Sequence, residues 1–423
     1  MSVIESKLKK SILIIGTVWP EPSSSAAGAR MLQIIKSFQK EFDVVEITFA
    51  SAAIINKHSF DLNSIGVKTQ SIELNNSSFD RFVKELQPSI VVFDRFMTEE
   101  QYGWRVSENC PDALLILDTE DLHFLRKARE KAWKKNIPFE AINFNEEETL
   151  RELASIYRCD ISLIISEVEL EFLMNHFNIP KQLLYELPFM LPSIRNEWTS
   201  SLPSFEKRNH FIFIGNFWHE PNYNAILYLK EKIWPLIRKE LPNAELHIYG
   251  AYGSQKVEQL HNEKERFIYK GRAENAYSVI KQAKVLLAPL RFGAGLKGKL
   301  IDTMVCGTPQ ITTSIGAEGM YKNLDTPGFI SDNELEFAKK SIQTYLNHSL
   351  WSKFQSKGFS VINELYNENS LSKSFANYIM DYCKNLNNHR NQNTVGNLLK
   401  MQSLNSSKYF SKWIEEKNKK KCD

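Results

Sequence analysis

Residues 288–304 read APLRFGAGLKGKLIDTM, and they indicate how the second half of the chain folds. The stretch follows an apolar run and predicts a buried strand, then a glycine-rich loop, then a helix. Gly293 and Gly295 allow the backbone to approach a ligand closely, with amide groups pointing toward it. The helix that begins near Lys297 adds unpaired N–H groups and the positive end of its dipole. The stretch therefore predicts an anion-binding turn between a strand and a helix.

Charged side chains in this stretch indicate which anion it would bind. Arg291, Lys297 and Lys299 place three cations within nine residues, which suits a diphosphate whose negative charge grows as it leaves. Asp302 follows Lys299 by three residues, so both can lie on one face of the helix. A carboxylate there can accept two hydroxyl hydrogens, as a ribose would supply. The same residues also fit a plain glycine-rich turn with a surface Lys–Asp pair.

The first half of the chain alternates short apolar runs with helical stretches. Helices are predicted over Ala29–Lys40 and Phe79–Gln87. Several predicted strands are unbroken blocks of Ile, Leu and Val, as in strands that are buried on both faces. The predicted strands are Ser11–Gly16, Asp43–Phe49, Val67–Leu74, Ser89–Asp94, Ala113–Asp118 and Ile161–Ile165. Alternation of this kind predicts a parallel sheet wrapped by helices.

The stretch Leu187–Asn209 interrupts this alternation and predicts a linker, because three prolines stand among polar residues. Alternation then restarts, with a helix over Asn224–Lys239 that Pro235 should kink or split. Further strands are predicted at His210–Gly215, Ala244–Gly250, Arg266–Tyr269, Lys284–Leu290 and Gln310–Ser314. After Glu334 the pattern is helical, over Leu335–Leu346, Trp351–Tyr366 and Leu371–Lys384.

These segments predict an α/β protein with two doubly wound domains that face each other across a cleft, followed by C-terminal helices. The predicted boundaries are residues 1–190 for the first domain, 191–209 for the linker, 210–350 for the second domain, 351–385 for closing helices and 386–423 for the tail. Open sheets of this type bind ligands beyond the carboxyl ends of their strands, so the predicted site is the cleft.

Composition excludes several classes of protein. The chain has 423 residues, enough for two domains, and its 43% hydrophobic and 24% charged residues are typical of a soluble globular protein. A net charge of +3 is too small for a dedicated nucleic-acid binder. The five cysteines are scattered without CxxC spacing, which argues against a disulfide framework or a zinc site. No apolar run approaches the ~20 residues that span a bilayer, so we expect a cytoplasmic protein.

The tail is basic and contains scattered apolar side chains. From Lys384 to Asp423, nine Lys or Arg stand against three Asp or Glu. The apolar and aromatic residues in this segment are Leu398, Leu399, Met401, Leu404, Tyr409, Phe410, Trp413 and Ile414. Such a segment can lie on the anionic inner face of a membrane and bring an enzyme to a lipid-linked acceptor. The interpretation that we favour from the sequence is a frayed, solvated tail.

Four spaced motifs make the second domain resemble a known family. In chain order they are Phe213–Asn222 (FIGNFWHEPN), Ile233–Arg238 (IWPLIR), Arg291–Asp302 and Thr312–Gly319 (TTSIGAEG). Together they resemble the donor-binding half of GT-B glycosyltransferases of the family 4 type, also called glycosyl transferases group 1. In the first half, the resemblance rests on the Pro-rich loop before Gly28-Ala29-Arg30 and on Asp118–Arg126 (DTEDLHFLR).

The resemblance implies a fold and an activity. The fold would be two Rossmann-like domains. The activity would be transfer of a hexose-type sugar from a nucleotide-diphosphate sugar to a bacterial envelope glycan or glycolipid. Enzymes that resemble this chain retain the configuration at the anomeric carbon and react on the front face of the donor. There the leaving phosphate itself assists deprotonation of the acceptor, so no dedicated base is required.

The resemblance also implies donor-binding roles for single residues. Arg291, Lys297 and Lys299 would hold the diphosphate, and Arg291 and Lys299 would be essential for turnover. Backbone at Gly293, Ala294, Gly295 and Leu296 would face the transferred sugar, and Asp302 would bind the ribose. His123 would reach the donor sugar from across the cleft as a catalytic residue, and Gly28 would let a loop of the first domain close over it. The remaining predicted donor-binding residues are Gly215, Asn216 and His219.

Other readings of these residues stay open. A lone histidine near a strand end, such as His123 or His219, is commonly a hydrogen-bonded structural residue. Asp94, Arg95 and Glu99 follow a predicted strand and are expected to line the acceptor pocket, although carboxylates at such positions are often merely solvated.

The sequence departs from the family pattern at several points. The family often carries two glutamates eight residues apart in this loop, whereas here Ala294 stands at the first position and Asp302 at the second. Asn216, His219 and Asn222 stand where an Arg and a Lys are usual, which shifts phosphate binding toward the Arg291–Lys299 loop. No Asp-x-Asp motif is present, so we expect the cationic loop to replace a divalent metal and expect no cofactor.

Three other functions are alternatives to sugar transfer. A nicotinamide dehydrogenase would need Gly-x-Gly-x-x-Gly after its first strand, where this chain reads Gly16-Thr17-Val18-Trp19-Pro20. A sugar epimerase or phosphorylase of similar architecture stays open, because a fold does not fix a reaction. A binding protein that has lost catalysis is also open, and Ala294 is the departure that favours it.

Overall fold

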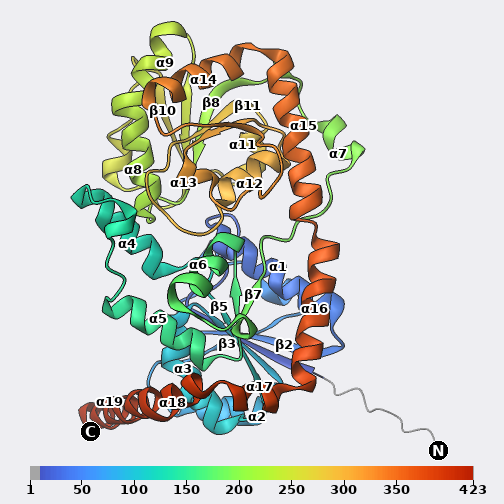
Figure 1. Cartoon of the computed structure of the whole chain (residues 1–423), viewed down its shortest axis with the longest axis vertical. Helices are drawn as coiled ribbons and strands as arrows, with labels where there is room; N and C mark the ends of the chain where they lie inside the picture. Colours follow the sequence, from blue (N-terminus) through green and yellow to red (C-terminus); the bar gives the residue numbers. More distant parts are fainter. Residues whose placement is uncertain (1–9, 423) are drawn as a thin grey trace, which may run out of the picture.

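The structure, a computed structural model, describes residues 10–422 and contains two parallel β-sheets, one above the other in Figure 1. We call the lower sheet and its helices the N-domain. Its seven strands, in spatial order β3-β2-β1-β4-β5-β6-β7, are β1 (Lys10–Gly16), β2 (Val44–Ser51), β3 (Lys68–Ser71), β4 (Ile90–Asp94), β5 (Leu114–Asp118), β6 (Ile161–Ile164) and β7 (Leu184–Glu186). Residues 1–9 of the predicted first domain, and Asp423 of the predicted tail, lie outside the described residues.

The upper sheet and its helices form the C-domain. Its six strands, in order β10-β9-β8-β11-β12-β13, are β8 (Asn209–Ile214), β9 (Leu246–Tyr249), β10 (Phe267–Gly271), β11 (Ala283–Ala288), β12 (Gln310–Thr312) and β13 (Gly328–Ile330). In both sheets the order reverses at the first strand, since β1 lies between β2 and β4, and β8 lies between β9 and β11. The strands of both sheets pair in parallel. The predicted doubly wound fold class is therefore confirmed.

Helices cover both faces of the N-domain sheet because its strands are apolar on both sides. Ile12 and Ile14 pack against α1 (Ala26–Glu41) and α16 (Glu368–Lys384). Leu13 and Ile15 face the opposite layer. The helices of that layer are α2 (Ser78–Leu86), α3 (Phe96–Asn109), α4 (His123–Lys135), α5 (Glu147–Arg158) and α6 (Glu167–Phe177). The strand–helix alternation of the sequence thus becomes three layers.

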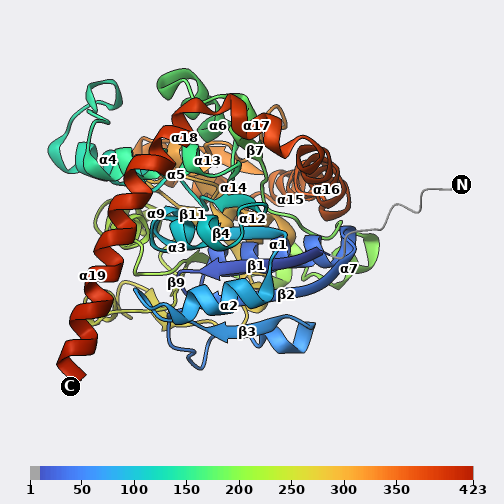
Figure 2. The same ribbon diagram turned by 90° about the horizontal axis from the view of Figure 1, so that it is seen from below.

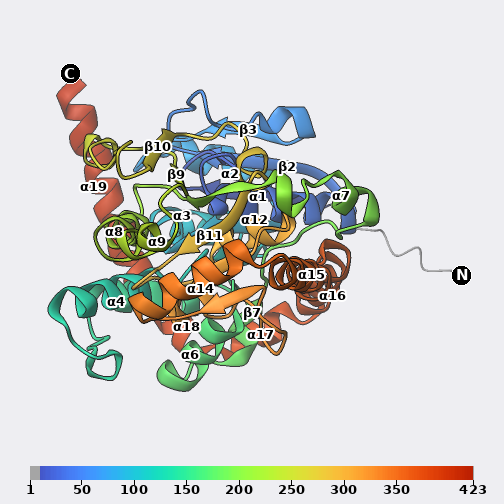
Figure 3. The ribbon, with the colours of Figure 1, turned by 90° about the horizontal axis from the view of Figure 1, so that it is seen from above.

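The C-domain has the same layered plan. Figure 3 shows α8 and α9 at one side of this domain and α15 at the other. The helices concerned are α8 (Glu220–Tyr228), α9 (Trp234–Glu240), α10 (Gln255–Glu258), α11 (Ala276–Ile280), α12 (Gly298–Val305), α13 (Ser314–Ala317), α14 (Glu334–Leu346) and α15 (His348–Leu365). A π-helical turn, Leu229–Ile233, splits the predicted helix Asn224–Lys239, and Pro235 then occupies the first turn of α9. Proline is tolerated there because that N–H would lack a helical partner anyway.

The two domains are connected twice. The predicted linker contains a short helix, α7 (Asn196–Ser201). The predicted closing helices divide between the domains, as Figure 1 shows. α15 packs on the C-domain, where the Trp351 indole donates to Lys284 O at 2.7 Å. α16 packs on the N-domain, where the Phe375 and Phe38 rings lie 5.5 Å apart.

The favoured prediction of a frayed tail is wrong over residues 386–422. These residues form α17 (Leu386–Gln392), α18 (Thr394–Leu399), a π-helical turn (Lys400–Leu404) and α19 (Asn405–Cys422). Figure 2 shows them running across the underside of the N-domain. Arg390 binds both carboxylate oxygens of Asp160, at 2.8 and 2.7 Å, and the Ser411 hydroxyl accepts from Arg105 at 3.1 Å. Polar side chains that the composition makes look solvated are therefore used to dock the tail.

Two strands were not predicted. β7 and β13 each have three residues at a sheet edge, which is too short for a periodic signal. Over residues 10–422, the helices are all too short or too polar to cross a lipid bilayer.

Candidate donor and acceptor site

A cavity of about 800 Å³ lies between the two domains, where the carboxyl ends of both sheets meet. Its N-domain wall comes from the loop after β1, from the residues that follow β4 and β5, and from the start of α4. Its C-domain wall comes from the loops after β8, β9, β10 and β11, and from the first turn of α12. The cavity thus occupies the position where doubly wound sheets bind ligands.

Lys299 stands in the C-domain wall, on the first turn of α12. Its Nζ donates to Asn222 Oδ1 at 2.6 Å and lies 4.1 Å from the centroid of the Phe213 ring. A Cβ at Gly215 would lie 3.0 Å from the Lys299 Nζ, so a glycine there makes room for the ammonium group. Burial, with repulsion from Lys297, lowers the pKa of Lys299 to about 7. A bound anion would favour its charged form.

The glycine-rich loop lines the cavity through Gly293, Ala294, Gly295 and Leu296, as predicted. Gly293 (φ 153°) and Gly295 (φ 65°) adopt backbone conformations that favour glycine. Lys297 also lines the cavity, but its Nζ donates to the carbonyl oxygens of Ala294 and Gly295. Lys297 therefore closes the loop on itself while it adds positive charge to the wall.

Further predicted donor residues lie on the same wall. Asp302 lines the cavity, and burial raises the pKa of its carboxyl to about 7. His219 lines it at the N-cap of α8, and burial lowers the pKa of its imidazole. Asn216 Nδ2 donates across the cleft to Ser24 O at 3.4 Å. Gly215 completes the set.

The role predicted for Arg291 is contradicted by its surroundings. Leu290 and Phe292 line the cavity, whereas the Arg291 guanidinium lies between two aromatic rings. Its Cζ is 4.5 Å from the centroid of Trp133 and 4.4 Å from that of Tyr228. Its Nε donates to Asn224 Oδ1 at 2.8 Å. The arginine therefore connects α4 of the N-domain to α8 of the C-domain and is turned away from a diphosphate in the cavity.

Two helix N-termini converge on the cavity. α1 begins at Ala26 and α12 begins at Gly298, and both residues line the cavity. They are in contact, since a Cβ at Gly298 would lie 2.5 Å from the Cβ of Ala26. Gly28 supports this arrangement from α1, because a Cβ there would lie 2.6 Å from the backbone of Glu21 in the preceding loop. The unpaired amides and positive dipole ends of two helices thus face one space.

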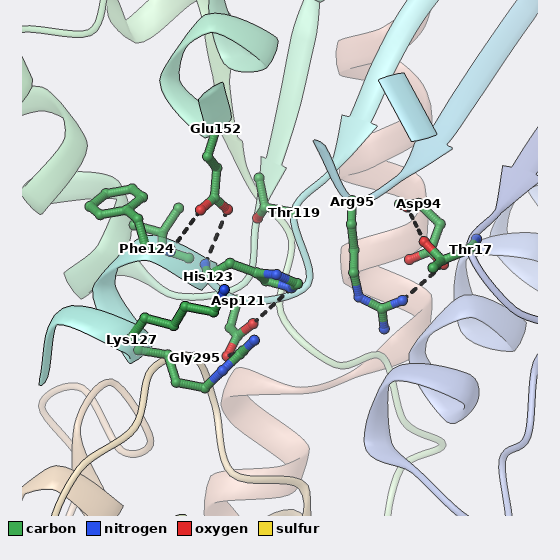
Figure 4. Close-up of polar contacts among 12 residues, drawn as sticks. Thr17, Asp94, Arg95, Thr119, Asp121, His123, Phe124, Lys127, Glu152 and Gly295 are labelled. Carbon is green, nitrogen blue, oxygen red and sulfur yellow. Dashed lines mark hydrogen bonds and ion pairs between the residues drawn. The ribbon is translucent and has the colours of Figure 1, made fainter. Parts of the chain in front are cut away.

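His123 lines the cavity from the N-domain, at the start of α4. Its backbone N–H and that of Phe124 donate to the Glu152 carboxylate at 3.1 and 2.8 Å (Figure 4). Its Nε2 lies 3.6 Å from Asp121 Oδ1, and Arg126 forms an ion pair with the same Asp121 carboxylate. Burial lowers the pKa of His123 to about 3, so its ring is neutral at physiological pH.

Arg95 and Glu120 follow β4 and β5 and line the cavity side by side with His123. Both have left-handed backbone conformations, with φ of 70° and 63°, which are uncommon for residues other than glycine. Arg95 Nη1 binds Asp94 Oδ2 at 3.2 Å (Figure 4). Glu120 Oε1 is buried and has no hydrogen-bond partner among the described residues. Burial and the nearby Asp118 raise the Glu120 pKa well above its usual value.

The other two predicted acceptor residues lie beneath this wall. Asp94 is buried, and its Oδ2 accepts from Thr17 N at 3.1 Å as well as from Arg95, so it supports Arg95. The prediction for Glu99 is wrong. Its carboxylate is buried within the N-domain, where Arg158 Nε donates at 2.8 Å and Ser155 Oγ at 2.7 Å.

Five charged residues of the cavity were missed at the level of single side chains, namely Glu120, Asp121, Arg126, Arg272 and Glu274. Arg126 follows His123 by three residues and so shares its helix face, a signal that the DTEDLHFLR motif contains. Arg272 comes directly after β10 and donates to the hydroxyls of Ser23 and Ser24 at 2.8 and 2.7 Å. Glu120 stands two residues after β5, but its inward position depends on a positive φ that composition does not indicate.

The charged side chains that line the cavity are nearly balanced in sign. The cations are Arg95, Arg126, Arg272, Lys297 and Lys299, and the carboxyl groups are Glu120, Asp121, Glu274 and Asp302. No group of three or more His, Cys, Asp or Glu side chains in residues 10–422 is arranged to hold a metal ion.

Part of the C-domain is similar to a known protein family. The family described as glycosyl transferases group 1 matches residues 208–347. An uncharacterized 44.6 kDa protein in the cps region of Klebsiella pneumoniae is 28% identical over 172 residues, which are 38% of this chain and 44% of that protein. The matched segment therefore spans less than half of this curated relative.

Solved structures show the same fold over nearly the whole chain. Sucrose-phosphate synthase of Thermosynechococcus elongatus superposes with a TM-score of 0.68 and 13% identity, over 88% of this chain and 99% of that one. Anabaena HepE, in complex with UDP and glucose, superposes with a TM-score of 0.64 and 10% identity, over 87% and 99%. The protein thus has the GT-B fold, and residues 208–347 of its C-domain are similar to the glycosyl transferases group 1 family.

Proposed function

We propose that the protein is a glycosyltransferase that moves a hexose-type sugar from a nucleotide-diphosphate sugar to a glycan or glycolipid acceptor. The observation that carries this proposal is the convergence of the α1 and α12 N-termini with Lys299 in one cavity between the domains. Amides, dipole ends and an ammonium group together stabilise the charge that a diphosphate gains as it leaves. Asp302, three residues after Lys299 on α12, would accept hydrogen bonds from the ribose hydroxyls. HepE, of the same fold, was solved with UDP and glucose.

Ligand binding and turnover test this proposal in two steps. A thermal-shift screen across nucleoside diphosphates and their sugars should raise the melting temperature for one nucleotide, since a ligand of the native state stabilises by mass action. With that donor, nucleoside diphosphate should be released only when an acceptor is present. Transfer of the sugar to inorganic phosphate would favour a phosphorylase. A product that is an epimer of the sugar supplied would favour an epimerase, and binding without turnover would favour an inactive binding protein.

We also propose that transfer needs no divalent metal. Lys299, Lys297 and Arg126 line the cavity and would supply the positive charge that a diphosphate needs in place of a metal. The rate of transfer should therefore be the same with EDTA as with added Mg²⁺ or Mn²⁺. A rate that collapses in EDTA and returns with one of these ions would refute this part of the proposal.

Retention of configuration is the stereochemistry we propose. The N-domain wall offers a neutral His123 and a Glu120 whose raised pKa favours its protonated form, which cannot accept a proton. This fits front-face transfer, in which the leaving phosphate takes the acceptor proton. NMR of the first-formed product should show the anomeric configuration of the donor, and an inverted anomer would overturn this assignment.

For the acceptor, we propose that Arg95 and Glu120 bind a hydroxyl-rich glycan headgroup. The pair offers hydrogen-bond donors beside an acceptor oxygen that is buried and unpartnered within the described structure. The related Klebsiella protein is encoded in a cps region. We propose a cytoplasmic enzyme that can be peripheral at the inner face of the membrane and that does not use nucleic acid.

The membrane part of this proposal rests on α19. Its Lys408 and Ser411 face the N-domain. Tyr409, Phe410 and Trp413 are 68%, 61% and 57% exposed, an arrangement that suits a helix lying on an anionic bilayer. The protein should co-sediment with phosphatidylglycerol vesicles, and the double variant Phe410→Ser, Trp413→Ser should not. Leu335→Ser, which changes an exposed leucine of α14, is the control. Equal binding of all three would refute docking through α19.

A further inference from the structure

Two N-domain side chains bind the backbone of the glycine-rich loop in the C-domain. Arg129, in the middle of α4, donates from Nη1 to Gly293 O at 2.9 Å. Glu169, in the first turn of α6, accepts from Gly295 N at 2.7 Å. These contacts lie on either side of Ala294, so the peptide groups around that residue are held from the opposite domain.

Both side chains are themselves fixed. The Arg129 guanidinium donates to the two carboxylate oxygens of Glu318 in the C-domain, at 2.6 and 2.8 Å. Glu169 also accepts from Leu122 N at 3.3 Å, next to His123, and its side chain is buried. Glu169 therefore connects the segment that carries His123 to the loop that faces the donor. Both bonds are accepted by the same oxygen, Oε1, and an oxygen shared in this way in a buried site ties the position of one segment to that of the other.

The glycines of the C-domain permit this close approach. A Cβ at Gly295 would lie 2.7 Å from the Asp121 Cβ, and one at Gly319 would lie 3.1 Å from the Ser166 Cβ. Asp121 and Ser166 belong to the N-domain, where they lie just before α4 and α6, the helices that carry Arg129 and Glu169. Gly295 is thus needed where the domains meet, and not only where a ligand would lie.

The contacts of Arg129 and Glu169 with the glycine-rich loop, which we call the clamp, also explain how the loop can carry an alanine at position 294. An alanine at this position packs in the hydrophobic cluster of the N-domain but cannot hydrogen-bond a sugar or the loop through its side chain. Arg129 and Glu169 supply polar contacts that fix the loop from outside. The loop is then shaped by the N-domain as well as by its own glycines and Lys297.

We propose that Arg129 and Glu169 are positioning residues that hold the glycine-rich loop in its donor-binding conformation, so that the donor site is complete only when the two domains are in contact. The proposal rests on the proposed function, because it assumes that the loop binds a nucleotide diphosphate. It adds that donor affinity depends on side chains outside the domain that holds the donor.

Two measurements on the full-length chain test this proposal. Hydrogen exchange of the Gly293–Leu296 amides, measured without ligand, should rise at least about ten-fold in Arg129→Ala and Glu169→Ala. Calorimetric titration with UDP should show affinity at least about ten-fold weaker in the same variants. Glu169→Gln should keep most of both properties, since the glutamine carbonyl can still accept from Gly295 N.

A matched control separates loop positioning from domain contact in general. Lys322 of the C-domain pairs with Glu186 of the N-domain at 2.8 Å, away from the glycine-rich loop. Lys322→Ala should leave loop exchange and UDP affinity within about two-fold of the unchanged protein. The clamp is overturned if Arg129→Ala and Glu169→Ala exchange like the unchanged protein, or if Lys322→Ala matches their effects.

The exchange measurement also distinguishes two kinds of failure. If the unchanged protein does not bind UDP or any other nucleoside diphosphate, the proposed function fails while loop exchange still tests the clamp. If it binds but the variants exchange normally, the clamp alone fails. Circular dichroism melts of each variant exclude global unfolding, and Glu169→Gln provides a folded comparison if Glu169→Ala is unstable.

Discussion

The C-domain wall of the cavity takes its longest contiguous part from one stretch, residues 293–302, and the rest from the loops after β8, β9 and β10, whereas the N-domain wall takes its groups from the ends of separate strands and from α4. The C-domain wall uses backbone amides, a helix N-terminus and lysines, which suit a diphosphate of any sugar. The N-domain wall uses individual side chains, Arg95, Glu120, His123 and Arg126. Groups that come from one stretch of sequence suit a ligand part shared by many donors, such as the diphosphate. Groups that come from separate segments can vary with the acceptor.

The walls also differ in how their charges are balanced. On the C-domain side, Lys299 has an amide as its hydrogen-bond partner and a pKa lowered by burial, so it gains from an incoming anion. On the N-domain side, Arg95 and Arg126 already pair with Asp94 and Asp121. The first wall is therefore poised for a charged ligand, and the second for a polar, uncharged one.

The largest expected effect is the loss of turnover on removal of Lys299, and Arg291, also on the C-domain side, is the comparison. Lys299→Ala should lower the rate of donor turnover on the order of 100- to 1,000-fold, as removal of one charge-stabilising donor does. Arg291→Ala should lower it about five-fold at most, because Arg291 makes exposed cation–π contacts worth roughly 0.5–1 kcal/mol. Steady-state release of nucleoside diphosphate measures both. Equal losses would mean that Arg291 reaches the donor after all.

The next effect distinguishes the two walls by the step that each is expected to serve, donor binding or sugar transfer. Glu120→Gln and His123→Ala should each lower transfer about ten-fold, as expected for the loss of one hydrogen bond of a neutral group. Neither change should alter UDP affinity more than about two-fold, whereas Lys299→Ala should weaken it at least ten-fold. Calorimetry and transfer assays on the same preparations give both quantities. A large loss of UDP affinity in Glu120→Gln would place the donor against the wrong wall.

A pH dependence should distinguish Lys299 from an ordinary lysine. Its pKa of about 7 in the free protein means that the charged form is lost as pH rises from 6 to 8, so UDP affinity should fall about ten-fold from this group. The comparison is made in Asp302→Asn, because the Asp302 carboxyl also loses its proton over the same range. Adding Lys299→Arg should abolish this fall. An identical pH profile with lysine and arginine would contradict the lowered pKa.

The smallest effect is on stability without ligand. Because the pKa of Lys299 is lower in the folded than in the unfolded chain, the unfolded state binds more protons between about pH 7 and 10.5. The ammonium therefore destabilises the fold below that range, and Lys299→Met should raise the melting temperature by about 2 °C at pH 7. Lys297→Met should lower it, since Lys297 binds two loop carbonyls. Differential scanning calorimetry without nucleotide tests both signs.

The sequence allowed the part of the C-domain wall between Gly293 and Asp302 to be predicted, because these groups lie in one motif whose local conformation places them. The residues after β10, such as Arg272, were missed because they come from a separate loop. The surroundings of Arg291 were missed as well, since the rings that hold it, Trp133 and Tyr228, come from helices far away in the sequence. On the N-domain side, strand ends located Arg95 correctly. Glu99 faces inward because the first turn of α3 packs against α5. Which side of a helix is buried depends on tertiary partners that no single segment shows.

A crystal structure of the protein with UDP tests the central claim most directly. The diphosphate oxygens should lie about 2.7–3.2 Å from Lys299 Nζ and from amides at the start of α12. The ribose hydroxyls should face Asp302, and Arg291 should remain between Trp133 and Tyr228. A nucleotide bound outside the interdomain cavity, or a diphosphate held by Arg291 with Lys299 uninvolved, would contradict the claim.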